Sequence, residues 1–226
     1  DVDAFTASLE GRVPDNALLS HDLFEGLHAR TGLVTDVEVV DDYPSSVLAH
    51  ARRQHRWTRG DWQILFWLLP FVPTRAGLAR NRLPLISRWK IFDNLRRALV
   101  APATLVLFLV AWTVLPGSPA LWTAAVVAAV AFPLLSLALE AVAGPKPHQP
   151  LRAFLRGLAE DAAATATRIA LQLAFLAHQA WSMVHAIGVT MVRVAITRRR
   201  LLEWETAAAS AARGARRERG TGARSF

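Results

Sequence analysis

Residues 98–139 carry no charged side chain at all. A helix that crosses a lipid bilayer needs only about 20 apolar residues, so this run is long enough for two crossings. The sequence Pro-Gly-Ser-Pro at 116–119 divides it, and these residue types end helices and form turns. We therefore predict a helical hairpin through a membrane, with one span over residues 98–115 and the other over residues 120–142.

The residues before this run indicate its orientation. Seven basic side chains precede it, against the single carboxylate of Asp93: Arg75, Arg80, Arg82, Arg88, Lys90, Arg96 and Arg97. Basic flanks of spanning helices lie on the cytoplasmic side, so the Pro-Gly-Ser-Pro turn is expected on the opposite side. The net charge is +8, but the basic residues flank apolar segments, so a nucleic-acid partner is not predicted. Cysteine is absent, which excludes disulfides and thiolate metal sites.

The first 70 residues have the pattern of a mixed α/β soluble piece. Ser20 suits the N-cap of a short helix that follows it. Residues 32–40 are rich in β-branched side chains and alternate apolar with polar residues after Val34, which predicts a strand. After a turn, Ser45 and Ser46 open a helix that we expect to run into Trp67.

The segments on either side of the hairpin are also apolar in part. Trp89 and Phe92, with basic residues around them, favour an amphipathic helix at the membrane surface. After a proline-rich linker at 144–150, a helical region extends to Ile196 and ends in Arg198-Arg199-Arg200. If this region crossed the membrane once, Arg198-Arg199-Arg200 would lie outside the cell, against the usual cytoplasmic position of basic residues. We favour two short spans or one partly interfacial helix, which keep the arginines in the cytoplasm.

The chain thus divides into five parts. We predict a mixed α/β soluble piece at 1–70, an interfacial amphipathic segment at 71–97 and a transmembrane helical hairpin at 98–142. A linker with further membrane or interfacial helices follows at 143–200, and a cytoplasmic tail or linker at 201–226. By pattern alone, the expected fold is this α/β piece followed by transmembrane helices, predominantly helical overall.

Two groups of residues in the soluble part could carry chemistry. Ser20-His21-Asp22 places a carboxylate at the opening of a helix, and residues 53–63 combine cations, aromatic rings and a glycine. Taken alone, the first could simply cap a helix, and the second could be the end of a basic amphipathic helix near lipid headgroups. Their joint occurrence just before a membrane hairpin favours a functional site.

The order of these groups resembles that of membrane-embedded, cellulose-synthase-like processive glycosyltransferases. Those enzymes have an acidic motif ending in Asp, then Gln-x-x-Arg-Trp, then interfacial and spanning helices. The variants here, Leu-Leu-Ser-His-Asp-Leu-Phe-Glu-Gly at 18–26 and Arg-Gln-His-Arg-Trp-Thr-Arg-Gly-Asp-Trp-Gln at 53–63, are similar to the glucosyltransferase domain of cyclic β-1,2-glucan synthases. Residues 1–5, 35–40 and 198–204 are similar to it as well.

The resemblance implies roles for particular residues. Forming a β-linkage from an α-linked nucleotide sugar inverts the anomeric carbon, and Asp22 is the expected base for the attacking hydroxyl. Arg53 and Arg56, three apart on one helical face, would bind the diphosphate, and Trp57 would support the acceptor sugar. Arg53 stands where the wider pattern has Gln, and Gln54 is displaced by one position. Gln54 is kept among the expected substrate-binding residues.

The same resemblance implies the domain, the reaction and its setting. Residues 1–70 would be the C-terminal half of a cytoplasmic glycosyltransferase domain. The fold class would be an α/β fragment of a nucleotide-sugar transferase domain followed by transmembrane α-helices, predominantly helical overall. It implies an inverting, multi-pass glucosyltransferase of the bacterial inner membrane that transfers glucose from UDP-glucose to a growing β-1,2-glucan. Mg²⁺ or Mn²⁺ is expected, with ligands mostly outside this chain, so no metal-binding residue is assigned here. A phosphorylase-like domain is expected downstream. Because the chain opens abruptly at Asp1, we expect the isolated segment to be inactive as a transferase.

Two alternative functions remain open from the sequence. One is the glucosyltransferase that makes linear osmoregulated periplasmic glucans, and the other is a non-catalytic membrane scaffold whose basic helix binds anionic lipid.

Other residues have simpler interpretations. His21 is expected to pack or form hydrogen bonds, and Arg59 and Asp61 to pair on a solvated face. Trp67 is expected in a core or interface, and His185, like His178, as a polar residue between helices.

Overall fold

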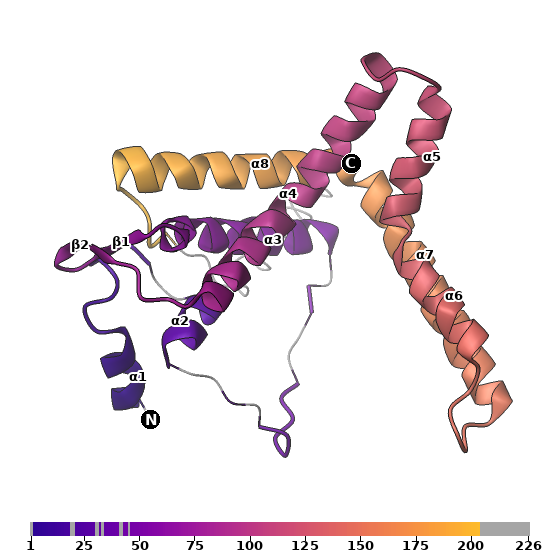
Figure 1. The fold of residues 1–226 in the computed structure, drawn as a ribbon, viewed down its shortest axis with the longest axis horizontal. Coiled ribbons are helices and arrows are strands. Elements are labelled where there is room, and N and C mark those ends of the chain that lie inside the picture. The colour runs from indigo at the N-terminus through magenta and orange to yellow at the C-terminus, as the bar shows by residue number, and fades with distance from the viewer. Residues whose placement is uncertain are drawn as a thin grey trace, which may run out of the picture. The chain divides into compact units, whose positions relative to one another are not determined.

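The structure is a computed structural model that describes residues 2–18, 21–29, 32, 34–40, 43–44 and 46–203. About 70% of it is helical, as predicted from the sequence (Figure 1). The chain forms two compact units. The first contains the residues up to Leu99 together with those from Ser182 onward, and the second contains Val100–Trp181.

The elements follow one another along the chain with only one pair of strands among the described residues. In order they are α1 (Val2–Leu9), α2 (Asp22–Ala29), α3 (Val47–Gln63), the 3₁₀ helix η1 (Leu65–Leu68), β1 (Phe71–Thr74), β2 (Gly77–Arg80), α4 (Leu85–Thr113), α5 (Pro119–Val130), α6 (Pro133–Ala143), α7 (Leu151–Ala174), α8 (Leu176–Met191) and the π-helical turn η2 (Val192–Thr197).

The core of the first unit joins α2, the end of α3, η1, β1 and the start of α4. Its buried members are Phe24, Ile64, Trp67, Val72, Ile91 and Leu95. Phe24 is fully buried and meets the ring of Trp67 edge to face, with 4.9 Å between ring centroids. This geometry is favoured by the quadrupoles of the two rings. The expected core role of Trp67 is confirmed.

Helix α3 forms for the reasons that its sequence predicted. The hydroxyl of Ser46 accepts a hydrogen bond from the Ala49 amide at 3.2 Å, which caps the helix. The α-helix ends at Gln63, earlier than expected, and η1 continues the chain as a 3₁₀ turn as far as Leu68. The predicted cap Ser20 lies outside the described residues.

The predicted strand over residues 32–40 is wrong. The described residues between 32 and 40 are neither helix nor strand, and Val39 and Val40 are 82% and 91% exposed. Alternating side chains make a strand only where a neighbouring strand offers backbone partners. In the described structure β1 pairs with β2 alone. No described residue before Phe71 is in a strand, so the α/β character expected there is not seen.

Helix α4 passes through the expected boundary at residue 97 without a break. Near its start, Ile91 and Leu95 are buried in the core, while Trp89 and Phe92 remain exposed with their ring centroids 5.6 Å apart. The first part of the expected interfacial segment is instead the β1–β2 hairpin. The helical part of that segment, residues 85–97, is therefore the first part of the longer helix α4.

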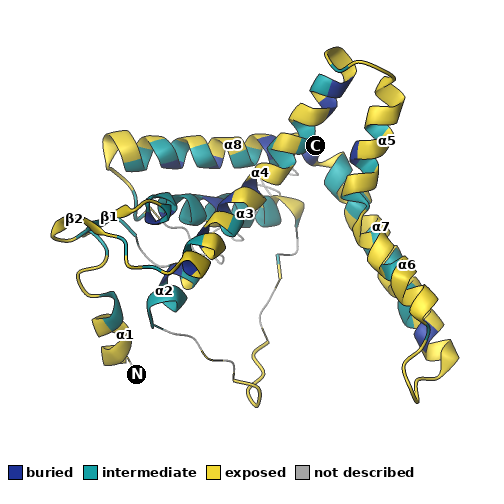
Figure 2. Ribbon diagram, in the orientation of Figure 1, coloured by how far each residue is buried: buried dark blue, intermediate teal, exposed yellow. Residues whose placement is uncertain are grey.

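The second unit contains the predicted turn between α4 and α5. The Trp112 indole N–H donates to the Thr123 hydroxyl at 2.9 Å, and the Trp122 indole N–H donates to the Pro116 carbonyl at 3.0 Å. Both bonds join residues close in sequence, on either side of the Pro-Gly-Ser-Pro turn. The outer surfaces of α5, α6 and α7 are largely exposed (Figure 2).

The second predicted span, residues 120–142, is not one straight helix. It is divided into α5 and α6, whose axes are bent by 63°. Pro133 stands at the first position of α6, where its missing N–H and its ring favour a break, although α4 continues through Pro102. The pair is a broken span or a re-entrant loop by length and composition.

Two further segments in the described structure are long and apolar enough to cross a membrane by themselves. They are α4 and the helix formed by α8 with η2, Leu176–Thr197. These helices are consistent with association with a membrane.

Candidate functional site

A cavity of about 840 Å³ lies in the first unit, between α2, α3, α4 and the part of α8 around Met183. It is lined by His21, Asp22, Leu23, Gln54, Arg56, Trp57, Thr58, Gly60, Asp61, Asn94, Arg97, Ala98 and Met183. Four of the five residues selected from the sequence are therefore brought together, namely Asp22, Gln54, Arg56 and Trp57. The fifth, Arg53, is not among the lining residues.

Asp22 is the first residue of α2 and is exposed at the cavity. The position before it is taken by His21, which acts as the helix cap. Its Nδ1 accepts a hydrogen bond from the Phe24 amide at 3.4 Å, and its own amide donates to Glu25 Oε1 at 3.0 Å. Since Phe24 is held in the core, the start of α2, and with it Asp22, has a defined position.

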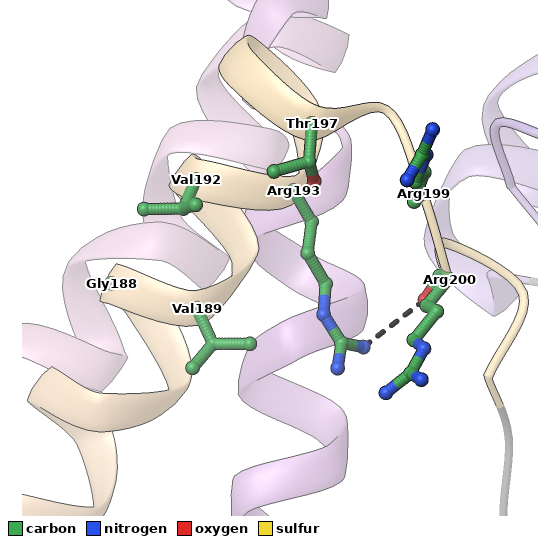
Figure 3. Close-up of a pocket in the computed structure, with 7 residues that line it drawn as sticks. All are labelled: Gly188, Val189, Val192, Arg193, Thr197, Arg199 and Arg200. Carbon is green, nitrogen blue, oxygen red and sulfur yellow. Dashed lines mark hydrogen bonds between the residues drawn. The ribbon is translucent and has the colours of Figure 1, made fainter.

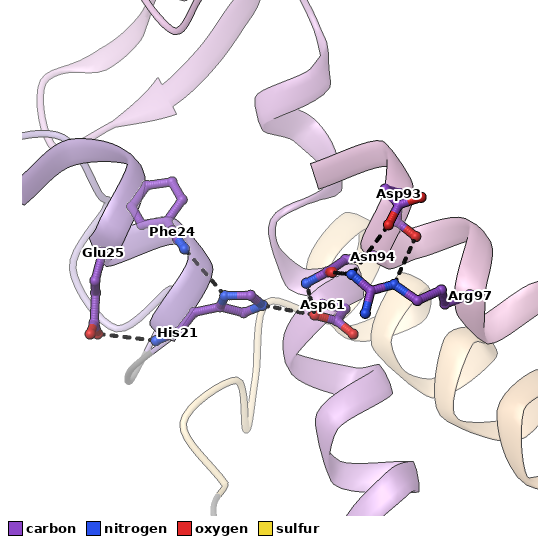
Figure 4. A network of polar contacts seen from close by, with 7 residues as sticks. All are labelled: His21, Phe24, Glu25, Asp61, Asp93, Asn94 and Arg97. Carbon is purple, nitrogen blue, oxygen red and sulfur yellow. Dashed lines mark hydrogen bonds and ion pairs between the residues drawn. The ribbon is translucent and has the colours of Figure 1, made fainter. Parts of the chain in front are cut away.

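His21 also connects α2 to α3 (Figure 4). Because Nδ1 accepts from a backbone amide, the proton of the neutral ring belongs on Nε2, which then donates to Asp61 Oδ1 at 3.1 Å. The His21 side chain is only 8% exposed and that of Asp61 24%. The expected hydrogen-bonding role of His21 is confirmed.

Helix α4 completes this network. The Asn94 side-chain amide donates to the same Asp61 oxygen at 3.0 Å, and Arg97 donates to the Asn94 carbonyl oxygen. Arg97 also forms an ion pair with Asp93 at 3.3 Å. The chain His21–Asp61–Asn94–Arg97 thus links three helices around the cavity.

The expected pairing of Arg59 with Asp61 is wrong. Asp61 faces His21 and Asn94, whereas Arg59 donates to the backbone carbonyl of Glu203 at 3.3 Å. Side chains two positions apart on a helix point in directions that differ by about 200° around its axis, so Arg59 and Asp61 lie on different faces. Burial lowers the pKa of Arg59 below its usual value, and the nearby positive charge of Arg193 adds to this.

Trp57 has its ring held by a cation. The Arg53 guanidinium carbon lies 4.4 Å from the centroid of the Trp57 ring and 5.6 Å from that of Tyr43. Such contacts contribute about 0.5–1 kcal/mol at exposed sites. Trp57 remains 45% exposed. Arg53 therefore orients the aromatic ring at the cavity, while Arg56 is one of the lining residues.

Helix α8 meets α3 within the first unit at two points. The buried Thr58 hydroxyl donates to Met183 Sδ at 3.0 Å, and His55 Nε2 lies 3.0 Å from His185 Nδ1. The interpretation of His185 as a polar residue between helices is confirmed, with His55 as its partner. Burial lowers the pKa of His55, and the charges of His185 and Arg59 lower it further.

The sequence interpretation missed Asn94 and Arg97 as lining residues. Arg97 was assigned only to the basic flank of the membrane span. A signal for Asp61 was present, because it follows Trp57 by four residues and so shares its helical face. No comparable signal connects α4 to α3, since the contact joins residues far apart in the sequence.

A metal site is not formed by the described residues. No three His, Cys, Asp or Glu side chains among them come together in a way that could hold an ion. Asp22 is accompanied at the cavity by Asp61, whose carboxylate is already bonded to His21 and Asn94.

Comparison with curated proteins shows that the chain is similar to a glucan synthase. Over 212 residues, 92% of its length, the chain is 40% identical to cyclic beta-(1,2)-glucan synthase NdvB of Rhizobium meliloti (strain 1021). The chain spans only 7% of the length of that protein. No protein-family model and no solved structure matches the chain.

Proposed function

Because the chain resembles cyclic β-1,2-glucan synthases over most of its length, we propose that it forms the acceptor side of a membrane-bound glucosyltransferase. The donor is UDP-glucose, the product is a β-1,2-glucan, and the anomeric carbon is inverted. The observation that carries this proposal is the cavity, which joins a carboxylate at a helix start to two guanidinium groups and an exposed indole.

Asp22 is the general base in this proposal. As the acceptor hydroxyl attacks the anomeric carbon, the bond from that carbon to the diphosphate breaks, and Asp22 takes the hydroxyl proton. A positioned general base contributes typically 10²–10⁴-fold to the rate. Asp22 suits the role because it is exposed at the cavity, while the second lining carboxylate, Asp61, already accepts two hydrogen bonds.

Arg56 and Arg97 stabilise the leaving diphosphate in this proposal. Both line the cavity, and guanidinium groups bind phosphate oxygens in pairs. Gln54 offers an amide to the sugar or the diphosphate, and Trp57 offers an apolar ring face to the acceptor. Arg53 acts on the substrate through the orientation of Trp57.

We also propose that a divalent ion takes part, with its ligands mostly on residues outside this chain. When bound, Mg²⁺ or Mn²⁺ would share the charge of the diphosphate. The described residues form no cluster for it, so none of the steps assigned to them depends on it. The bacterial inner membrane, the cytoplasmic side for the cavity and a phosphorylase-like domain downstream belong to the same proposal.

Replacing Asp22 by Asn in the full-length protein tests the proposal. We expect the transfer of radiolabelled glucose from UDP-glucose to polymer in membranes to fall by 10²–10⁴-fold, because the base is lost. Glu10→Gln is the matched control, since it removes the same charge from an exposed position outside the cavity. Unchanged polymer in Asp22→Asn at normal membrane insertion would support the non-catalytic scaffold. A polymer without β-1,2 linkages would refute the proposed product.

A further inference from the structure

The end of α8 has an unusual backbone. The helix changes to the π-helical turn η2, and Arg198 and Arg200 then adopt left-handed conformations with φ of 49° and 56°. Such angles are uncommon and costly for residues with long side chains, and π turns are frequent at functional sites. The two left-handed residues flank Arg199.

A second cavity, of about 480 Å³, lies beside this turn. It is lined by Gly188, Val189, Val192, Arg193, Thr197, Arg199 and Arg200. It shares no lining residue with the proposed sugar site. Figure 3 shows the side chains of Arg193 and Arg200 extending in the same direction beside the helix that carries the two valines. The cavity is therefore lined by apolar valines of the helix, by Arg193 of η2 and by the arginines of the loop.

Side chains from α3 and η2 hold the loop in place. Gln63 donates to the Leu201 carbonyl at 2.8 Å, and Arg59 donates to the Glu203 carbonyl at 3.3 Å. Arg193 donates to the Arg200 carbonyl at 3.1 Å. Three bonds from side chains to consecutive parts of one short loop keep its arginines near the helix. The site is thus formed before any ligand binds.

Positive charge is in excess at this cavity. Within the described residues, the one carboxylate paired with its arginines is Glu203, which lies 2.8 Å from Arg193 and is 52% exposed. The positive charge of Arg193 also contributes to the lowered pKa of Arg59. An anion that can accept bonds from two or more guanidinium groups would relieve this repulsion.

The surroundings of the cavity indicate which anion fits. Val192, which lines it, is 47% exposed, and Leu176–Thr197 is apolar enough to cross a membrane. A cationic group at the end of such a helix lies at the level of the lipid headgroups. We propose that this cavity binds the phosphate headgroup of an anionic membrane lipid, with an acyl chain lying along Val189 and Val192.

Titration of the full-length protein in detergent with phosphatidylglycerol tests this proposal. The binding constant of the tightest lipid adduct is measured by native mass spectrometry, with phosphatidylcholine as the neutral reference. In the variant Arg193→Gln/Arg199→Gln/Arg200→Gln we expect about 100-fold weaker phosphatidylglycerol binding, from three lost contacts near an anionic surface. Phosphatidylcholine binding should not change.

A matched variant separates a built site from general charge. Arg75→Gln/Arg80→Gln/Arg82→Gln removes the same charge from residues outside the cavity, and it should retain the wild-type affinity. An equal loss in both variants would overturn the proposal. Displacement of the lipid by an equal concentration of inorganic phosphate or UDP would also overturn it, because a free phosphate would then be the ligand.

Two single variants test the site even if the triple variant does not fold. Arg199→Gln alone breaks none of the hydrogen bonds and ion pairs described above, and should weaken lipid binding about fivefold. Glu203→Gln removes the internal partner of Arg193, so lipid binding should tighten. Unchanged affinity in both variants would refute the site.

Discussion

Contacts of different range form two regions of the molecule, the cavity lined by Asp22 and Arg56 and the apolar hairpin around the turn at 116–119. At the cavity, His21 of α2 reaches Asp61 of α3, and Asn94 of α4 reaches the same carboxylate. At the hairpin, Trp112 and Trp122 bond to residues 11 and 6 positions away on either side of one turn. The polar contacts of the first region join distant segments, whereas those of the second join neighbours across one turn, although Phe108 and Val126 also pack against the distant Leu176.

This difference matters for the proposed chemistry. A base and its cations must be placed within small tolerances, and rigid neighbours supply that placement. The cavity residues are fixed by a buried core and a polar network on three helices. The hairpin has to supply mainly apolar surface, for which the orientation of single side chains matters less.

The largest expected effect comes from the core below the cavity. Phe24→Ala should lower the free energy of local unfolding of α2 by about 3–5 kcal/mol, since Phe24 is fully buried. Hydrogen exchange of the α2 amides in the full-length protein measures this. Phe132→Ala, in the hairpin unit and 63% exposed, is the comparison, with an expected effect within about 0.5 kcal/mol. Similar effects at both positions would contradict the difference between the regions.

A double-mutant cycle on His21 and Asp61 tests the polar link. Alanine at either position removes the 3.1 Å contact, so the two effects on α2 protection should be non-additive by about 1–2 kcal/mol. Each variant should also reduce glucose transfer while the KM for UDP-glucose stays near normal, because the link positions Asp22 and does not contact the donor. Additive effects would show that the two residues act independently.

A smaller effect is expected in the hairpin. Trp112→Phe keeps the aromatic ring but removes the N–H that bonds to Thr123 at 2.9 Å. Hydrogen bonds between membrane helices contribute about 0.6 kcal/mol on average. Amide exchange around residues 119–123 should therefore quicken only about threefold. Trp89→Phe, at an exposed ring in the first unit, serves as the control and should leave this exchange unchanged.

The smallest effect concerns pH. Burial, followed by the charges of His185 and Arg59, lowers the pKa of His55 below its ordinary value of about 6.5. The unfolded chain then binds the proton more readily, so the contribution of His55 to stability is fully present above about pH 6.5 and declines as the pH falls below it. Amide protection of α3 measured across this range should decrease at low pH. The decrease should vanish in His55→Asn.

Several features were predictable because they depend on neighbours in the sequence. The uncharged run, the turn at 116–119 and the Ser46 cap of α3 are local, and the structure has a turn and a cap at these places. The selected residues Asp22, Gln54, Arg56 and Trp57 follow from two short motifs, and all four line one cavity. The bend before Pro133 could also have been anticipated from the proline.

The remaining features required the tertiary structure. Alternation over residues 34–40 could not become a strand because no described segment pairs with it, a condition that no local pattern contains. Likewise Asn94 and Arg97 reach the cavity only because Ile91 and Leu95 of the same helix are buried against Phe24 and its neighbours. Sequence alone determines which side chains a helix face presents. Only packing between distant segments, driven by the burial of apolar surface, decides which faces meet.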